Sequence, residues 1–308
     1  MGLKIGTFDN TREWIDFSSL DMLMKCPRWY YWRAVCGITP SGVSSSLING
    51  SAYHLAWAAY ELAKMDKQPE QVCINAGLQA LVKSDITKIK DDPYRNLTAA
   101  TDTLIAYWER WKSENYTTID VEVGFAVDLG GVVFIGKIDR VCESPLGLMV
   151  MEHKTTSIIG NKWDKRGRPN LQIDGYVSAY SILTGKKLYG AVLDVCPVPY
   201  RKALKSGEKK QEAFRIITSR NAEDIDCWIA NVNEWWITLQ RYRTDHTWPM
   251  NTERCYPMTG YDCPYPSLCS MFPHPTQVPK EFTIPSEFIV EHWAPFDLEG
   301  GNAVAEVI

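Results

Sequence analysis

The sequence predicts an α/β (α+β) fold in which a central sheet is flanked by helices, and three observations support this prediction. Apolar side chains recur at helical spacing in the front part of the chain, over residues 50–64, 70–83 and 98–112. From about residue 117 the apolar period changes to two, and turn sequences separate the segments 119–129, 132–141 and 148–154. Beyond them we expect a helix, two strands and a long amphipathic helix, at 170–183, 188–196, 212–218 and after residue 221. Strands and helices in this order are typical of a sheet core wrapped by helices.

The chain is expected to form one structural unit made of four successive regions. A helical N-terminal region covers residues 1–116, and the core that contains the sheet covers 117–245. A Cys-rich segment follows at 246–280. The last residues, 281–308, have few periodic apolar side chains and are expected to be a tail.

Composition and charge exclude several classes of protein. The chain has 308 residues, with 33 basic and 37 acidic side chains and a net charge of −4. A general polyanion binder would be basic, so any site for nucleic acid must be local. No apolar run is long enough to span a bilayer, so a membrane is not expected as a partner. The chain lacks the GxxxxGK[ST] and GxGxxG motifs, which argues against a nucleotide-driven motor and a dinucleotide enzyme.

Three residues on two neighbouring predicted strands suggest hydrolytic chemistry. Alternation along the strands allows Asp139, Glu152 and Lys154 to converge if the two strands pair across the turn at 144–147. Carboxylate oxygens bind Mg²⁺ or Mn²⁺, and a neighbouring lysine can orient a metal-bound water or offset charge on a phosphate. The spacing alone leaves open the alternative that these are charges on a solvent-facing strand.

Several further segments carry a resemblance to a known family. Residues 136–140 read GKIDR and residues 151–156 read MEHKTT, and together they resemble the catalytic centre of PD-(D/E)xK nucleases of the RecB type. Upstream, residues 26–28 (CPR) look like part of the family's opening helix, and residues 50–54 (GSAYH) look like its histidine motif. Downstream, residues 172–176 (QIDGY) are similar to its QxxxY helix, and all of these motifs occur in the family's order.

This resemblance implies a restriction-endonuclease-like core and a divalent metal ion, Mg²⁺ or Mn²⁺. The implied metal ligands are the side chains of His54, Asp139 and Glu152 and the backbone carbonyl of His153. Lys154 would activate water or stabilise charge, Gln172 and Tyr176 would lie over the active site, and Glu122 would give weaker, indirect support. Taken without the family, a histidine such as His54 is more often a buried, hydrogen-bonded helix residue than a metal ligand. Gln172 and Tyr176, four residues apart, could be the polar ends of a packing stripe.

The cysteines suggest a second metal centre. Cys255, Cys263 and Cys269 lie close together in sequence but lack the C-x2-C spacing of a zinc ribbon, although zinc bound by four thiolates stays possible. AddB-like and CRISPR-adaptation nucleases join one cysteine ahead of the nuclease core to three behind it and bind a [4Fe–4S] cluster. The resemblance therefore implies such a cluster on Cys26, Cys255, Cys263 and Cys269. The other cysteines are expected to be buried thiols, namely Cys36, Cys73, Cys142, Cys196 and Cys227.

Two basic segments are candidate DNA contacts. The candidate residues are Lys162, Lys165, Arg166 and Arg168 in the first segment and Arg201, Lys202 and Lys205 in the second. The alternative is that both are solvated loops.

The resemblance implies a metal-dependent DNA nuclease, and we expect an exonuclease acting on DNA with a free end in recombination, repair or end processing. Its stand-alone size is similar to phage-type nucleases, whose partner would be a single-strand annealing protein or a helicase. The N-terminal residues lack the apolar stretch of a secretory signal, so the expected location is the cytoplasm of a bacterial or phage-infected cell. The alternatives are a catalytically idle DNA-binding or scaffold subunit and a structure-specific endonuclease.

Overall fold

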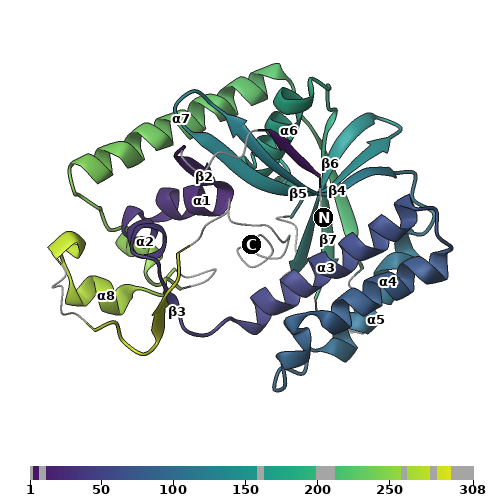
Figure 1. The fold of residues 1–308 in the computed structure, drawn as a ribbon, viewed down its shortest axis with the longest axis horizontal. Helices are drawn as coiled ribbons and strands as arrows, with labels where there is room; N and C mark the ends of the chain where they lie inside the picture. The colour runs from purple at the N-terminus through teal and green to yellow at the C-terminus, as the bar shows by residue number, and fades with distance from the viewer. Residues whose placement is uncertain are drawn as a thin grey trace.

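A mixed sheet of seven strands forms the centre of the computed structural model, which describes residues 3–6, 12–157, 163–198, 212–257, 262–277 and 283–292 (Figure 1). The strand order is β1-β4-β5-β6-β7-β8, and β2 lies beside β5. The strands are β1 (Lys4–Gly6), β2 (Trp14–Asp16), β4 (Thr117–Asp128), β5 (Val133–Ser144), β6 (Gly147–Thr156), β7 (Gly190–Pro197) and β8 (Phe214–Ser219). Together with the flanking helices, this sheet confirms the predicted fold class.

The strand pairing follows the sequence pattern in the middle of the sheet and departs from it at two places. β4, β5 and β6 are antiparallel neighbours, as predicted, and β8 is antiparallel to β7. β7 is parallel to β6, because helix α6 (Leu171–Thr184) forms the crossover between them. The N-terminal strands β1 and β2 add to the sheet parallel to β4 and β5. The sequence gives no sign of these two strands, because three residues are too few to display a period of two.

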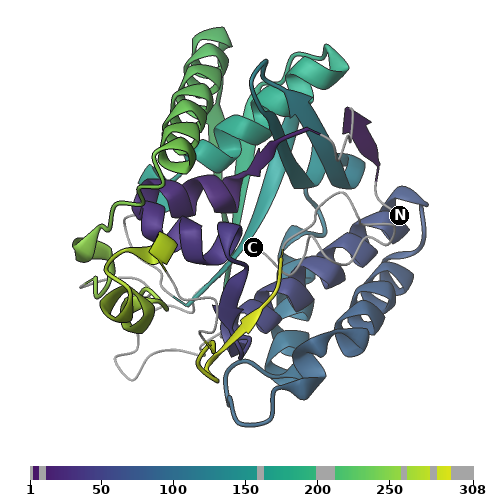
Figure 2. The same ribbon diagram turned by 60° about the vertical axis from the view of Figure 1, so that its left-hand side comes forward.

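Helices cover both faces of the sheet (Figures 1 and 2). One face packs against α1 (Phe17–Lys25), α6 and α7 (Ala222–Thr244) in the largest apolar cluster, which contains Phe125, Phe134 and Trp228. The other face is covered by α3 (Ser45–Met65), α4 (Glu70–Lys83) and α5 (Leu97–Trp111), whose core includes Trp57 and Trp108. Within the described ranges, none of the helices is both long and apolar enough to cross a membrane.

The N-terminal and C-terminal parts of the chain meet beside the sheet. Strand β3 (Ile38–Pro40) pairs antiparallel with β9 (Phe288–Val290), so part of the expected tail is a strand. The Tyr265 hydroxyl donates to the carbonyl of Ile38 at 2.7 Å, and its ring stacks on Phe288. Three short helical elements complete this region, namely α2 (Pro27–Tyr30), η1 (Tyr31–Val35) and α8 (Pro266–Met271). Residues at the two ends of the chain therefore share one small core.

A chain of buried charges joins α3 and α5 to the sheet. Arg140 of β5 is 1% exposed and contacts Glu61 of α3 at 3.3 Å and Glu114, just after α5, at 2.7 Å. Glu114 also contacts Arg215 of β8 at 2.6 Å. Burial opposes ionisation of Glu114, but Arg140 and Arg215 lower its pKa to about 2. The helices are thus fixed to the sheet by a network of buried ion pairs, in which the loss of one member leaves a buried charge with fewer partners.

Replacing Glu114 tests this connection through the dependence of stability on pH. Because the folded-state pKa is about 2 and the ordinary value is 4.5, the stabilisation is complete above about pH 4.5 and is lost as the pH falls towards 2. We expect Glu114→Gln to lower the unfolding free energy by about 3 kcal/mol or more at pH 7. The difference from wild type should shrink by about 2 kcal/mol at pH 3, measured by urea denaturation.

The exposed carboxylate of Glu109 on α5 provides the matched control. Glu109→Gln should change the unfolding free energy at pH 7 by no more than about 0.5 kcal/mol. A gap between wild type and Glu114→Gln that stays constant from pH 7 to pH 3 would contradict the assignment of Glu114 as the ionised partner.

Candidate active site

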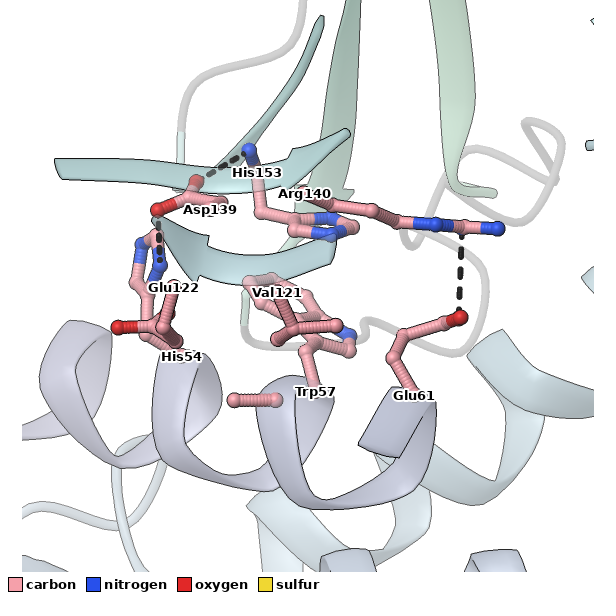
Figure 3. A pocket seen from close by; sticks show the side chains of 9 residues that line it. His54, Trp57, Glu61, Val121, Glu122, Asp139, Arg140 and His153 are labelled. Carbon is pink, nitrogen blue, oxygen red and sulfur yellow. Dashed lines mark hydrogen bonds and ion pairs between the residues drawn. The ribbon is translucent and has the colours of Figure 1, made fainter. Parts of the chain in front are cut away.

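Three carboxylates lie side by side where β4, β5 and β6 run next to one another. The β4–β5 register pairs Val121 with Arg140 and so sets Glu122 opposite Asp139. The β5–β6 register ends at the pair Arg140 and Met151, and the next position brings Glu152 beside Asp139. Helix α3 crosses these strands, and its His54 points towards Asp139 (Figure 3).

Asp139 is a buried, ionised carboxylate with two partners from different elements. His54 Nδ1 lies 3.2 Å from Asp139 Oδ1, and the backbone N–H of His153 donates to Oδ2 at 2.8 Å. Burial opposes ionisation, but His54 and the hydrogen bond from His153 hold the pKa of Asp139 well below its ordinary value. Because the β5–β6 ladder has already ended, the Asp139 side chain provides the acceptor that a neighbouring strand would otherwise give to His153.

Glu152 is buried, and its carboxylate lacks hydrogen-bond donors in the described part of the chain. Its residue is 1% exposed, and neither carboxylate oxygen accepts a hydrogen bond of acceptable geometry from the described residues. Lys154 Nζ lies 2.5 Å from Oε1 as an ion pair. Burial and the charge of Asp139 raise the pKa of Glu152 to about 7, against the opposing effect of Lys154. A buried carboxylate with free lone pairs beside a second carboxylate is a suitable place for a cation.

Lys154 is held by residues of α6. Its Nζ donates to Gln172 Oε1 at 2.9 Å, and Gln172 Nε2 in turn donates to the Tyr176 hydroxyl at 2.9 Å. Asn170 caps this helix by accepting from the backbone N–H of Ile173, which fixes the turn that carries Gln172. Gln172 and Tyr176 are both buried and form a polar chain that reaches the lysine. The structure therefore brings these predicted residues together with Asp139, Glu152 and His54.

Glu122 lies closer to this group than the sequence analysis expected. Its carboxylate, His54 and Asp139 each offer one ligand atom within 4.8 Å of the others. The Glu122 backbone has φ of 54°, a left-handed conformation that is rare for residues other than glycine and that often marks functional sites. Lys137 forms an ion pair with it. Counting the register from the turn at residues 129–132 would have placed Glu122 opposite Asp139, and this was the signal available in the sequence.

These side chains are chemically suited to a divalent metal ion. Carboxylate oxygens and one imidazole nitrogen are ligands that Mg²⁺ and Mn²⁺ accept. Lys154 offsets part of the negative charge that Glu152 and Asp139 bring together, and the Glu152 oxygens accept no hydrogen bond among the described residues. A further cation therefore fits this site.

The four predicted cluster cysteines are also near one another. Cys26, Cys255 and Cys269 each contribute to raising the pKa of Cys263, which burial raises to about 12. Two N–H groups point at sulfurs: the Trp32 indole donates to Cys269 Sγ at 3.4 Å, and the backbone of Asn251 donates to Cys26 Sγ at 3.4 Å. Of the remaining cysteines, Cys73, Cys142 and Cys196 are buried and Cys36 is half-buried. The prediction is wrong at Cys227, which is exposed on α7 because it lies away from the helix face that packs on the sheet.

Three of the basic residues proposed to contact DNA lie within the residues that the structure describes. Lys165 and Arg166 are exposed, and the Arg166 guanidinium lies 4.6 Å from the centre of the Trp163 ring. Arg168 forms an ion pair with Asp224 at 2.6 Å, so its charge is partly offset. The candidates Lys162, Arg201, Lys202 and Lys205 lie outside the residues that the structure describes.

One of the comparisons with known proteins identifies the family of this chain. A search of curated proteins finds no match to the sequence. Among solved structures, the chain is similar to one described as "Crystal structure of SSO0001", with 16% sequence identity over 73% of this chain and 75% of that chain and a TM-score of 0.28. A family model described as the PD-(D/E)XK nuclease superfamily matches residues 17–270. Since the match spans most of the sequence and includes every strand from β4 to β8, the chain belongs to the PD-(D/E)XK nuclease superfamily.

Proposed function

We propose that this protein is a metal-dependent deoxyribonuclease that hydrolyses DNA phosphodiester bonds at the site formed by β4, β5, β6 and α3. Membership of the superfamily implies nuclease activity. The observation that carries the proposal is the buried Glu152 carboxylate, which has no hydrogen bond among the described residues and lies beside the ionised Asp139. The ion pair with Lys154 offsets only part of this charge, and binding of a divalent cation would offset the rest.

The metal ligands in this proposal are His54, Asp139, Glu152 and the backbone carbonyl of His153. A bound Mg²⁺ or Mn²⁺ would polarise the phosphate and lower the pKa of a coordinated water. Glu122 is a further candidate ligand, because its carboxylate is within reach of the atoms offered by His54 and Asp139.

Lys154 is proposed to act on the reacting groups directly. Its ammonium lies between Glu152 and Gln172, so its position is fixed from two sides. A cation at this position can orient the attacking water and offset the charge that develops on the phosphate. Gln172 and Tyr176 hold the lysine there, since Gln172 donates to Tyr176 and accepts from Lys154.

More specifically, we propose an exonuclease that acts on DNA ends in recombination, repair or end processing. The proposed phosphate contacts are Lys165, Arg166, Arg168 and the segment containing Arg201, Lys202 and Lys205. A single-strand annealing protein or a helicase would supply the partner. The competing proposal is an idle DNA-binding subunit, which the complete set of Asp139, Glu152 and Lys154 disfavours.

Digestion of linear and covalently closed circular DNA tests the function. With Mg²⁺ or Mn²⁺, the wild-type protein should degrade end-labelled linear DNA and leave the circle intact. Asp139→Ala should reduce the rate by at least about a thousandfold, because it removes a charged ligand at the reacting centre. Cleavage of the circle would instead indicate an endonuclease, and a fully active Asp139→Ala variant would show that the active site lies elsewhere.

The contribution of Glu122 is tested by metal titration. Glu122→Gln keeps the size of the side chain but removes its charge, so the Mg²⁺ concentration for half-maximal cleavage should rise about tenfold. Asp120→Asn is the matched control, since Asp120 lies two residues earlier on β4 and contacts Tyr180 of α6. Equal Mg²⁺ requirements for Glu122→Gln and Asp120→Asn would remove Glu122 from the proposed ligands.

We also propose that Cys26, Cys255, Cys263 and Cys269 bind a [4Fe–4S] cluster. Zinc holds its four sulfurs about 3.8 Å apart, because each Zn–S bond is about 2.3 Å. In the described ranges, no three of these thiols lie within 4.8 Å of one another. The wider spacing supports the larger group, and the N–H groups of Trp32 and Asn251 suit thiolate ligands.

Metal analysis of anaerobically purified protein tests the cluster. We expect about four iron atoms per chain together with broad visible absorbance. Cys269→Ser should lower the iron content and bleach the absorbance. The control Cys227→Ser should leave both unchanged, because Cys227 is exposed on α7. About one zinc per chain and no iron would overturn the cluster assignment.

A further inference from the structure

On the face of the sheet opposite to Glu152 and Lys154, a second row of side chains crosses three strands. The parallel register of β6 and β7 pairs His153 with Asp194, and the register of β7 and β8 pairs Asp194 with Arg215. Because successive residues of a strand point to opposite faces, Glu152 and Lys154 face α6 while the His153 ring faces α3 and α5. The row His153, Asp194 and Arg215 therefore begins on β6, the strand that also carries Glu152 and Lys154.

The His153 ring is held on all sides by these elements. It stacks on Trp57 of α3 with ring centroids 4.6 Å apart, and its Nδ1 lies 3.3 Å from Asp194 Oδ2 (Figure 3 shows the ring above Trp57). The Tyr107 ring of α5 meets it edge-on at 6.4 Å. The residue is 3% exposed, so the ring has no freedom to turn without disturbing the helices.

Asp194 is the charged member of this anchor. It is 0% exposed, accepts a hydrogen bond from the Tyr107 hydroxyl and lies 3.2 Å from Arg215 Nη2. Burial opposes its ionisation, but Arg215 and His153 lower its pKa to about 2. All three partners of this buried carboxylate approach Oδ2, and one of them is His153 of β6, which lies between Glu152 and Lys154 in the chain.

The backbone of His153 takes part in the site through both its N–H and its carbonyl. Its N–H donates to Asp139, and in the proposed function its carbonyl is a metal ligand. Since the β5–β6 ladder ends at Met151, His153 pairs with β7 alone among the described strands. The orientation of its N–H and carbonyl, which belong to two successive peptide units, consequently depends on how firmly the ring is held.

We propose that Asp194 is a positioning residue for the active site, which acts through the His153 ring. It fixes the backbone of His153, whose N–H orients Asp139 and whose carbonyl is the proposed metal ligand. The inference rests on the proposed nuclease function. Asp194 touches neither metal nor DNA in this proposal and acts only through His153. Asp194 would resemble the residues that hydrogen-bond to metal ligands and orient them without touching the metal. Loss of such a residue weakens metal binding or activity by about 10-fold to 100-fold.

The test compares Asp194→Asn with the control Glu114→Gln. Glu114 belongs to the same buried charge network, because it also contacts Arg215, but it does not contact His153. Two readouts are measured: the Mn²⁺ dissociation constant of DNA-free protein, by electron paramagnetic resonance, and the kcat and KM for linear DNA. We expect Asp194→Asn to weaken Mn²⁺ binding and lower kcat by about tenfold or more, with KM changed by less than about twofold. Glu114→Gln should lose stability yet keep the Mn²⁺ dissociation constant within about twofold of wild type.

Each outcome decides the inference. Wild-type Mn²⁺ binding in Asp194→Asn would overturn it, as would an equal loss in Glu114→Gln, since this would reveal a general effect of destabilisation. If Asp194→Asn does not fold, Tyr107→Phe takes its place, because it removes only the hydroxyl that donates to Asp194. It should weaken Mn²⁺ binding by about threefold, and an unchanged constant would overturn the inference.

Asp139→Ala, measured in parallel, separates this inference from the proposed function. If Asp139→Ala abolishes Mn²⁺ binding and cleavage while Asp194→Asn behaves as wild type, only the role of Asp194 is wrong. If Asp139→Ala changes neither property, the proposed function fails and the positioning role fails with it.

Discussion

The Asp139 carboxylate connects three elements that are far apart in the sequence. It belongs to β5, approaches His54 of α3 and accepts from the backbone of His153 in β6. It does so at the point where main-chain pairing between β5 and β6 stops. Without this acceptor, the N–H of His153 would be buried and unpaired, which costs about 1–3 kcal/mol. One side chain thus closes the sheet locally and supplies the charge around which the candidate site is built.

Placing carboxylates next to this charge is unfavourable for the fold. Glu122 and Glu152 occupy the neighbouring positions across the strands, and burial with Asp139 raises the pKa of Glu152 to about 7. The chain offsets part of the repulsion with Lys137 beside Glu122 and Lys154 beside Glu152. The left-handed backbone at Glu122 adds strain of about 1–3 kcal/mol. A cation that binds here would stabilise the folded protein by relieving the repulsion between the carboxylates. The same repulsion therefore destabilises the fold locally and favours metal binding.

The sequence allowed much of this arrangement to be predicted, and the failures have physical reasons. The strands from β4 to β7 have eight to twelve residues, which is long enough for their apolar content and flanking turn sequences to predict them, although every residue of β7 is buried. β1, β2 and β9 have three residues each, and their pairing depends on partners more than a hundred residues away. The charges of Asp194 and Arg215 resemble those of a solvated strand, because alternation alone does not show that α3 and α5 cover that face. His54, Gln172 and Tyr176 could be placed only because the family pattern linked them to Asp139.

The segment from Glu152 to Lys154 is held from both faces of the sheet, and the two supports come from different parts of the chain. On one face, Gln172 of α6 holds Lys154, and on the other, Trp57 and Asp194 hold His153. The second support depends on α3, whose first turn is capped by Ser44. Ser44 lies four residues after β3, which pairs with β9 next to the cysteine region. A cluster that joins Cys26 to Cys269 would therefore fix the start of the helix that carries both His54 and Trp57, and so would act on the metal site from a distance by restricting where α3 can lie.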